Sequence, residues 1–300
     1  MAASRQRALI TGLSGFTGRY LADELAQHGY EVFGTGSAPS EGDNFFQVDL
    51  GDAERMRELI AGVRPDVVVH LAALAFVGHG NPEDFYRVNL LGTRHLLEAL
   101  VAADHRPRCV LLASSANVYG NSTEGLIHET TPPAPANDYA VSKLAMEYMA
   151  ALSKERLPLV VVRPFNYTGV NQDTRFLLPK IVAHFRSGAD RIELGNLDVS
   201  RDFSDVRTVV EVYRRLLDSQ SAIGGTFNVS SGVSYSLRDV IAMCEEITGR
   251  KIKVEVNPTF VRPNEVKTLR GSNELLRTVI GDWRVRELRE TLSWMLGSTG

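Results

Sequence analysis

Three residues in the middle of the chain, Ser115, Tyr139 and Lys143, have the types and the spacing for acid–base chemistry. On a helix, positions four apart lie on one face, so the Lys143 ammonium would lie beside the Tyr139 phenol. A free tyrosine has a pKa near ~10, and a neighbouring cation lowers it by favouring the phenolate. Tyr139 is therefore a candidate proton donor and acceptor, with the Ser115 hydroxyl placed to hydrogen-bond a substrate oxygen. Because this spacing is also common on surface helices, the pair needs a second signal.

The second signal is the glycine-rich segment Gly-Leu-Ser-Gly-Phe-Thr-Gly at residues 12–18. It follows a short apolar run at residues 8–11, which predicts a strand, and precedes an amphipathic helix that reaches about residue 28. Glycines permit a tight turn and let backbone amides approach a pyrophosphate at a helix N-terminus, where the dipole favours an anion. Between a strand and a helix, the triplet predicts a dinucleotide-binding turn. The residues expected to contact the cofactor here are Gly12, Gly15, Phe16, Thr17 and Gly18.

The end of the second predicted strand, residues 31–33, bears on the choice of cofactor. It leads into Gly-Thr-Gly-Ser at residues 34–37, where an NAD-preferring site usually carries an acid for the ribose hydroxyls. This chain has no acid there, and no Arg or Lys follows closely. The missing carboxylate removes a repulsion against a 2′-phosphate and leaves Thr35 and Ser37 as donors. We therefore expect NADP or NAD, with a slight preference for NADP.

Two more strand ends are expected to border the cofactor. Asp49 and Leu50 end a third strand, residues 45–49, where they could border the adenine, although an Asp there is equally often the cap of the next helix. Residues 67–73 form a continuous apolar run typical of a strand buried in a parallel sheet. We expect His70 within it to be a core or hydrogen-bonded histidine. The residues that leave room for the cofactor at the end of this strand are Leu71, Ala72 and Ala73.

The pattern of strands and helices predicts the fold class. A helix opens at Pro82 and runs to about residue 103, and Asn89 inside it predicts a buried hydrogen bond that steadies the catalytic helix. The strand at residues 109–113 leads to Ser115, and further elements follow at about 138–156 (helix) and 159–162 (strand). Strict alternation of strand and helix predicts an α/β fold with a doubly wound parallel sheet of the Rossmann type.

The second half has a looser pattern. Ser236 and Asp239 have the spacing of a capping box for a helix that ends near Gly249. The other expected helices are 176–186, 206–217, 273–279 and 285–296, and the expected strands are 192–194, 201–203, 226–229 and 251–256.

Composition narrows the class of protein. The formal net charge is −3, and no basic block occurs, which argues against a general nucleic-acid surface. Cys109 and Cys244 lie in apolar runs and read as reduced core residues, with no disulfide framework and no metal site indicated. No apolar run approaches the ~20 residues of a membrane span. We expect a soluble cytoplasmic protein with no membrane partner.

Together, Gly12-x-x-Gly15-x-x-Gly18, Ser115 and Tyr139-x-x-x-Lys143 resemble an extended short-chain dehydrogenase/reductase acting on a nucleotide sugar, over nearly the whole chain. The resemblance implies an NAD(P)-binding Rossmann domain at residues 1–165, to which residues 204–232 cross back. It implies a smaller α/β nucleotide-sugar-binding domain at residues 166–203 and 233–300. It also implies a homodimer in which the long helices at 82–103 and 138–156 pair with their copies.

Motifs of the second half resemble the GDP-mannose branch of this family, whose members are 4,6-dehydratases and reductases of GDP-4-keto-6-deoxy-D-mannose. The motifs are Arg-Pro-Phe-Asn-Tyr-Thr-Gly at 163–169, Gly-Asn-Leu-Asp-Val-Ser-Arg-Asp-Phe at 195–203 and Arg-Pro-Asn-Glu at 262–265. By that likeness Asn166, Lys180 and Arg201 would face the diphosphate. Arg262 and Glu265 would clasp the nucleoside ribose, since a carboxylate suits a vicinal diol. Surface ion pairing is the alternative reading for each charged residue.

One departure separates the two kinds of member. Dehydratases need an acid–base carboxylate just after the catalytic hydroxyl, and this chain has Ala116 and Asn117 there. An amide does not exchange that proton, so we expect elimination to fail and ketone reduction to remain. In that reaction Tyr139 would protonate the C4 oxygen, Lys143 would tune Tyr139 and hold the nicotinamide ribose, and Ser115 would polarise the carbonyl. Asn117 would orient the sugar, and the product would be GDP-D-rhamnose (GDP-6-deoxy-D-mannose) or its C4 epimer.

Two other functions fit part of the pattern. A sugar-nucleotide 4-epimerase would use the same tyrosine and keep NAD⁺ tightly bound. A non-catalytic Rossmann protein that senses the redox state of the dinucleotide would not need Ser115, Tyr139 and Lys143 together, so their presence argues against it.

Overall fold

The computed structural model describes residues 5–39, 42–76, 81–121, 125–260 and 267–298. Its larger sheet has seven parallel strands in the order β11-β7-β5-β4-β1-β2-β3. Their bounds are β1 (Arg7–Thr11), β2 (Glu31–Gly36), β3 (Phe45–Gln47), β4 (Val67–His70), β5 (Cys109–Ala113), β7 (Leu159–Pro164) and β11 (Thr226–Val229). The predicted fold class, a doubly wound parallel sheet, is confirmed.

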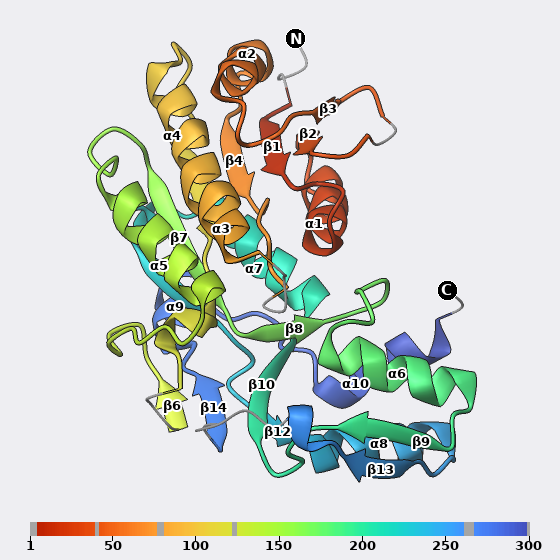
Figure 1. Cartoon of the computed structure of the whole chain (residues 1–300). Coiled ribbons are helices and arrows are strands. Elements are labelled where there is room, and N and C mark those ends of the chain that lie inside the picture. Colours follow the sequence, from red (N-terminus) through yellow and green to blue (C-terminus); the bar gives the residue numbers. More distant parts are fainter. Residues whose placement is uncertain (1–4, 40–41, 77–80, 122–124, 261–266, 299–300) are drawn as a thin grey trace.

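Helices cover both faces of this sheet (Figure 1). Apolar side chains of α1 (Phe16–Gln27), α7 (Val206–Leu217) and α9 (Glu274–Ile280) pack on one face. Those of α2 (Ala53–Val63), α4 (Thr93–Ala102) and α5 (Asp138–Ala151) pack on the other. Because both faces are covered, the central strands are mostly apolar, as the run Val67–Val69 illustrates with no exposed surface.

The segment predicted as one helix from Pro82 is built differently. It consists of α3 (Pro82–Phe85), the π-helical segment η1 (Tyr86–Gly92) and α4. A π-helical turn holds an extra residue, which changes the direction in which the following side chains point. Here it turns Asn89 into the core, where only 1% of its surface is exposed. The prediction of a regular helix over 82–103 is therefore wrong in its middle.

A second lobe is built mainly from later residues (Figure 1). Its main sheet has the order β12-β10-β14-β6, with β8 also paired to β10, and β9 pairs with β13. The bounds are β6 (Gly125–Ile127), β8 (Asn166–Thr168), β9 (Arg191–Leu194), β10 (Ser200–Asp205), β12 (Ser234–Ser236), β13 (Lys253–Val256) and β14 (Thr268–Gly271). Three helices pack around an apolar core of its own: α6 (Leu177–Ser187), α8 (Leu237–Thr248) and α10 (Leu288–Gly297). Short 3₁₀ turns complete the chain: η2 (Ala116–Tyr119), η3 (Gln220–Ala222) and η4 (Pro258–Phe260).

Two segments after the first six sheet strands return to the larger sheet. Helix α7 packs on its face, and β11 pairs with β7 at its edge. The second lobe has its own core. However, α9, which lies within the predicted domain at 233–300, packs on the larger sheet, and β6, which lies within the predicted domain at 1–165, pairs with β14 of the second lobe. The domain boundaries therefore stay a prediction. The capping box of α8 is confirmed, since Ser236 and Asp239 bond each other's backbone amides. Cys109 and Cys244 are buried and free, as expected of core thiols.

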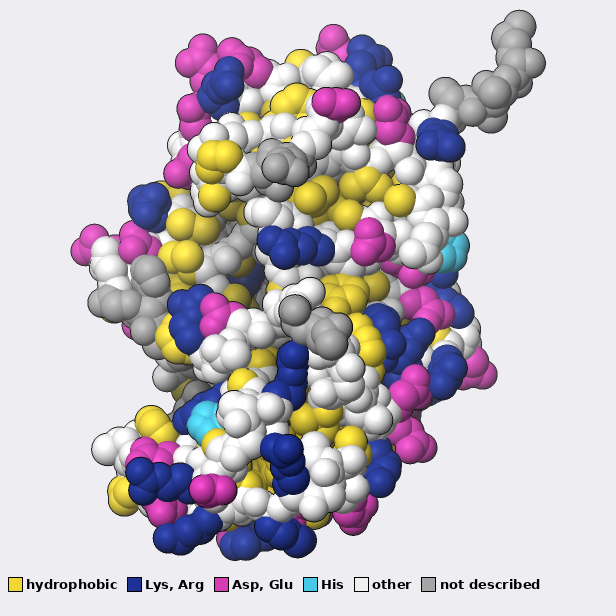
Figure 2. Space-filling model, turned by 90° about the vertical axis from the view of Figure 1, so that its right-hand side faces the viewer, with side chains coloured by type: hydrophobic (Ala, Val, Ile, Leu, Met, Phe, Trp, Pro, Cys, Tyr) yellow, Lys and Arg dark blue, Asp and Glu magenta, His cyan; other side chains and the backbone are white. Residues whose placement is uncertain are grey.

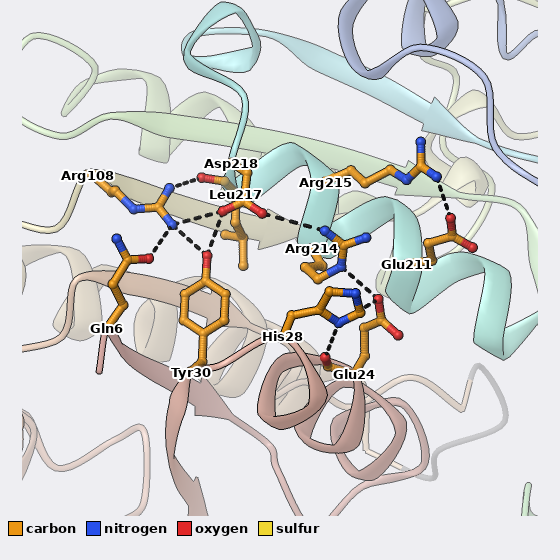
Figure 3. A network of polar contacts seen from close by, with 10 residues as sticks. All are labelled: Gln6, Glu24, His28, Tyr30, Arg108, Glu211, Arg214, Arg215, Leu217 and Asp218. Carbon is orange, nitrogen blue, oxygen red and sulfur yellow. Dashed lines mark hydrogen bonds and ion pairs between the residues drawn. The ribbon is translucent and has the colours of Figure 1, made fainter. Parts of the chain in front are cut away.

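A polar network joins the amino ends of the sheet strands to the end of α7 (Figure 3). Arg108, just before β5, donates to Tyr30 Oη at 2.5 Å, to Asp218 Oδ1 at 3.0 Å and to the Leu217 carbonyl. The Tyr30 hydroxyl also donates to Asp218 at 2.6 Å. This network lies at the edge of the sheet opposite the carboxyl strand ends, so it ties α7 down without touching the candidate site described below.

The surface does not gather one kind of charge on the face shown in Figure 2, where acidic and basic side chains are interspersed over both lobes. Among the helices of the described residues, none combines the length and apolar composition needed to cross a bilayer.

Candidate functional site

The glycine turn between β1 and α1 forms a cradle, a space that side chains at the glycine positions would fill. Gly12 has φ +76°, and a Cβ there would lie 2.8 Å from the Ala72 backbone nitrogen. A Cβ on Gly18 would lie 2.4 Å from the Gly12 carbonyl oxygen. Gly15 caps α1 without a side chain, so the amides of the first turn of α1 have no side-chain partner. The cradle and these amides fit the pyrophosphate of a dinucleotide.

The neighbouring strand ends lie close to this turn. The chain after β4 passes against Gly12, which brings the segment of Leu71, Ala72 and Ala73 to the glycine turn as expected. The strand itself ends at His70, earlier than predicted.

At the end of β2 only one of the two expected donors is available. Thr35 is buried, and its carbonyl accepts the amides of Gly12 and Leu13, so its side chain does not face a cofactor; that expectation is wrong. Ser37 is exposed just beyond the strand.

The residues after β3 divide between two roles. Asp49 is exposed and accepts the Gly51 amide at 2.7 Å, whereas the cap of α2 is Asp52. The alternative reading of Asp49 as the helix cap is therefore wrong. Leu50 is buried, and its carbonyl bonds His95 at 2.9 Å. That Asp49 and Leu50 border the adenine stays a prediction.

The three candidate catalytic residues come together at the carboxyl end of β5. Helix α5 carries Tyr139 and Lys143 on one face, and the Tyr139 phenol hydrogen-bonds the Ser115 hydroxyl. The Lys143 ammonium donates to the Ala113 carbonyl at 2.7 Å. Ser115 is held in place because its hydroxyl also accepts the Asn117 amide at 3.2 Å.

The charges of this group differ from the sequence-based expectation. Burial raises the pKa of Tyr139 to about 12, and the hydrogen bond from Ser115 opposes that rise only in part. Burial likewise lowers the pKa of Lys143 to about 8, against the attraction of Glu147. The expectation that Lys143 brings the pKa of the phenol below its usual value is therefore wrong for the protein alone, because desolvation is the largest effect and only the Ser115 hydrogen bond opposes it.

A polar cavity opens beside Ser115. Ser115, Ala116 and Asn117 form one wall, and Asn166 and Arg201 come from β8 and β10 in the second lobe. None of the residues that the structure describes along this cavity is acidic. Tyr139 does not line it, but its hydroxyl lies one hydrogen bond behind Ser115. The remaining lining residues are Gly120, Asn121, Pro164, Phe165 and Leu269.

The predicted substrate residues do not all gather at this cavity. Asn166 donates to the Asp202 carbonyl at 3.2 Å, which fixes its amide beside Arg201. Lys180 lies elsewhere: its ammonium donates to the Glu193 carbonyl at 3.0 Å and lies 4.8 Å from the Phe260 ring centroid. The structure therefore does not bring Lys180 beside Arg201 as a second cation. Arg262 and Glu265 lie outside the described residues.

Side chains of the glycine turn also reach the second lobe. Phe16 stacks on Tyr167 with ring centroids 6.2 Å apart, and the Thr17 hydroxyl lies 2.9 Å from the Tyr167 hydroxyl. Tyr167 of β8 thus connects the expected cofactor turn to the strand that carries Asn166. The contact of Tyr167 with the glycine turn was not predicted from the sequence, although Tyr167 lies inside the 163–169 motif.

Two readings of supporting residues are confirmed. His70 bonds the hydroxyls of Thr11 and Thr93 at 2.7 and 2.8 Å, and burial lowers its pKa to about 3, so it is a neutral core histidine. Asn89 accepts the Leu74 amide and donates to the Ser142 hydroxyl at 3.0 Å. Since Ser142 is on α5, this bond steadies the helix that carries Tyr139 and Lys143.

A buried ion pair that was not predicted from the sequence lies behind the candidate catalytic residues. Arg163 Nη2 lies 2.6 Å from Glu147 Oε2, and the Ser114 hydroxyl donates to the same carboxylate. Glu147 is four positions beyond Lys143, so the spacing Tyr-x-x-x-Lys-x-x-x-Glu could have indicated it.

The comparison with family models agrees with this site. Residues 9–295 match the model of the GDP-mannose 4,6 dehydratase family. The match spans nearly the whole chain, including the glycine turn, the catalytic helix and both lobes.

Curated relatives and solved structures cover the chain from end to end. The GDP-6-deoxy-D-talose 4-dehydrogenase of Aggregatibacter actinomycetemcomitans is 34% identical over 96% of each chain. The GDP-6-deoxy-D-mannose reductase of Pseudomonas aeruginosa is 35% identical over 94% of this chain and 99% of its own. A Burkholderia cenocepacia J2315 protein, provisionally described as an epimerase, is 55% identical over 97% of each chain, with a TM-score of 0.92. RMD from Pseudomonas aeruginosa, solved with NADPH, is 33% identical over 97% of this chain and 98% of its own, with a TM-score of 0.84.

These matches confirm the resemblance drawn from the motifs, and they support an enzyme of the NAD(P)-dependent oxidoreductase class. The chain belongs to the GDP-mannose 4,6-dehydratase family of extended short-chain dehydrogenases/reductases.

Proposed function

We propose that this enzyme reduces the C4 ketone of a GDP-4-keto-6-deoxyhexose. The observation that carries the proposal is the pair Ala116 and Asn117, which follows the catalytic hydroxyl in a cavity whose described lining holds no carboxylate. Elimination across the sugar needs a base that removes a carbon-bound proton, and neither side chain can act as one. Reduction needs only a hydride source, a proton donor and a group that hydrogen-bonds the carbonyl oxygen.

The chain's own residues supply the last two of these. Tyr139, protonated at neutral pH, donates its proton to the C4 oxygen as that oxygen gains charge. The Ser115 hydroxyl donates a hydrogen bond to the same oxygen and stabilises the developing charge. Asn117 and Asn166 orient the sugar and phosphates, and Arg201 offers a cation to the diphosphate.

A nicotinamide dinucleotide, when bound, supplies the hydride. The residues to hold it are the glycine turn of Gly12, Gly15 and Gly18 and the segment Leu71–Ala73, with Lys143 on the nicotinamide ribose. NADPH is the preferred form, because the end of β2 has the exposed Ser37 hydroxyl and no carboxylate to repel a 2′-phosphate.

The test supplies GDP-4-keto-6-deoxy-D-mannose with NADPH or NADH and follows the loss of absorbance of the reduced cofactor. We expect turnover with the sugar nucleotide and none without it. NMR of the product then determines the configuration at C4. The reductase from Pseudomonas is named for the 6-deoxy-D-mannose product and the dehydrogenase from Aggregatibacter for 6-deoxy-D-talose, which are C4 epimers.

A 4-epimerase is the second candidate, favoured by the Burkholderia protein at 55% identity. Epimerases regenerate their cofactor within each cycle, so tightly held NAD⁺ in the purified protein would support this function. Release of the cofactor on dilution, together with stoichiometric oxidation of NADPH, would exclude it.

A further inference from the structure

A buried carboxylate, Glu147, lies directly behind the candidate catalytic residues and has no part in the proposed reaction. It is on α5, one turn beyond Lys143, and its side chain is 10% exposed. Arg163 of β7 donates to it from Nε at 3.0 Å and from Nη2 at 2.6 Å. The Ser114 hydroxyl donates to the same carboxylate. A buried carboxylate with two guanidinium bonds and a hydroxyl bond has a fixed position.

The contacts of Arg163 extend this arrangement to a further strand. Arg163 Nη1 donates to the Tyr119 hydroxyl at 3.0 Å, and the guanidinium carbon lies 5.0 Å from the Tyr119 ring centroid. Tyr119, in the turn after Ser115, donates to Asn228 of β11 at 2.7 Å. Three strands and the 3₁₀ turn η2 are therefore tied to one carboxylate on the catalytic helix.

We propose that Glu147 is a positioning residue for the reduction. Through Ser114 and Arg163 it fixes α5 against the end of β5, and so sets how Tyr139 meets Ser115. It also places a negative charge one helical turn from the Lys143 ammonium. The kinetic part of this inference rests on the proposed ketone reduction, whereas the charge on Lys143 depends on the protein alone.

Among the residues that the structure describes, no other group near Lys143 supplies this negative charge. On α5 its neighbours are Glu147 and Tyr139, and β4 contributes His70, which burial keeps neutral. The elements α3, η1 and α4 that pack on α5 also carry charged side chains, of which Arg87 pairs with Asp84 and Arg94 with Glu98. The side chains that these elements direct toward α5 include the uncharged Phe85 and Asn89. At the exposed start of the helix, Tyr86 donates to Asp138. Arg163 is itself paired with Glu147, and among the charged groups of the described residues it is the Glu147 carboxylate that raises the pKa of Lys143 against the effect of burial.

The first experiment measures the pKa of Lys143 in the free protein by carbon-13 NMR of its ε-carbon, assigned by the loss of its signal in Lys143→Arg. Glu147→Gln keeps the size of the side chain and removes its charge, so the pKa of Lys143 should fall by roughly one pH unit. Glu98→Gln removes an exposed carboxylate that pairs with Arg94 on α4 and should change nothing. An unchanged pKa in Glu147→Gln would overturn the electrostatic part.

The second experiment separates the effect of side-chain length at position 147 from the effect of its charge. Glu147→Asp keeps the charge but is too short to bond Ser114 and Arg163 together, so kcat should fall roughly tenfold while KM for the sugar nucleotide stays the same. Ser114→Ala removes a single hydroxyl from a site that tolerates a small side chain, and should lower kcat several-fold. If both variants retained full kcat, with only their melting temperatures lowered, Glu147 would be a purely structural residue and the proposal would be wrong.

The two proposals fail in different ways. Absence of turnover by the unmodified enzyme would refute the ketone reduction, while the NMR experiment would still decide whether Glu147 sustains the charge on Lys143.

Discussion

At the residue scale, burial shifts the pKa values of Tyr139 and Lys143 in opposite directions, because it disfavours the charged form of each. The phenol, with its pKa raised to about 12, keeps its proton at neutral pH, which suits a group that must donate one. The ammonium, with its pKa lowered to about 8, loses its charge not far above neutrality. The protonation states of both groups at neutral pH are therefore consequences of desolvation at this site.

Replacing the phenol tests the proton donor. Tyr139→Phe keeps the ring that packs on Phe85 and removes only the hydroxyl, so kcat for ketone reduction should fall at least about a hundredfold with little change in KM. Tyr30→Phe is the matched control, because it removes a hydroxyl bonded to Asp218 at the opposite edge of the sheet. That control should lose stability but keep kcat. Full kcat in Tyr139→Phe would show that Tyr139 is not the proton donor.

The alkaline limb of the pH profile tests Lys143. Its pKa in the folded protein lies below that of a free lysine, so the ammonium is present below pH about 8 and is lost as the pH rises through that value. We expect kcat/KM for reduction to decline above that pH, because the cation that holds the nicotinamide ribose is gone. Lys143→Arg, which stays charged, should not show this limb, provided that it folds. A flat profile for the unmodified enzyme would contradict the assignment.

The proposed preference for NADPH is tested at a single exposed side chain, Ser37. Ser37→Asp places a carboxylate at the end of β2, where it can accept from the ribose hydroxyls of NADH and repel a 2′-phosphate. KM for NADPH should rise roughly tenfold or more relative to KM for NADH. Ser37→Asn, which lacks the charge, should leave the ratio nearly unchanged. Steady-state kinetics with both cofactors measure it, and an unaltered ratio in Ser37→Asp would show that the 2′-phosphate binds elsewhere.

At the scale of elements, the site depends on how α5 is held. The π-helical segment η1 directs Asn89 toward Ser142, and the Ser142 hydroxyl in turn donates to the Tyr139 carbonyl at 2.7 Å. Glu147 holds the same helix from the side of the sheet. One helix is therefore fixed on two sides, which gives the phenol a defined position.

Removing the amide of Asn89 should loosen this support. Asn89→Leu has a similar volume but leaves the Leu74 amide, the Leu74 carbonyl and the Ser142 hydroxyl without that partner. We expect the free energy of unfolding to fall by roughly 2–4 kcal/mol, measured by urea denaturation. Ser142→Ala, which removes a single hydroxyl, should cost less. Equal stability of Asn89→Leu and the unmodified protein would mean that η1 does not support α5.

At the scale of the whole molecule, α5 also presents apolar side chains outward. Leu152 is 80% exposed and Tyr148 66%, and both follow Val141 along one side of the helix. An apolar surface of this kind on a helix favours association with another surface. It lies on one of the two helices that we expect to pair in a homodimer.

A charge on this surface tests the dimer. Leu152→Glu should shift the protein toward monomers, because pairing would bury two like charges near the twofold axis. Val256→Glu is the control, since Val256 is 55% exposed on β13 of the second lobe. Sedimentation analysis gives the mass of each species. A monomeric unmodified protein, or a dimer that Leu152→Glu leaves intact, would contradict the pairing.

The sequence by itself determined that the larger sheet is parallel and doubly wound, and it supplied the motifs from which the site is predicted. Strand–helix alternation, the glycine turn and Tyr139-x-x-x-Lys143 are local patterns whose physical meaning depends on a few neighbouring residues. The strands at residues 109–113 and 226–229 and the helix at 206–217 agree with the structure end to end. Local patterns also identified His70 and Asn89 as buried hydrogen-bonded residues.

Only the tertiary structure decided what depends on distant segments. The π-helical turn in η1, the burial of Thr35, the position of Lys180 away from Arg201 and the ion pair of Glu147 with Arg163 all involve residues far apart in the chain or the packing around them. The raised pKa of Tyr139 is the clearest case. Spacing on a helix predicts that a cation lies near the phenol, but only the packed lobes remove the water that would otherwise stabilise the phenolate.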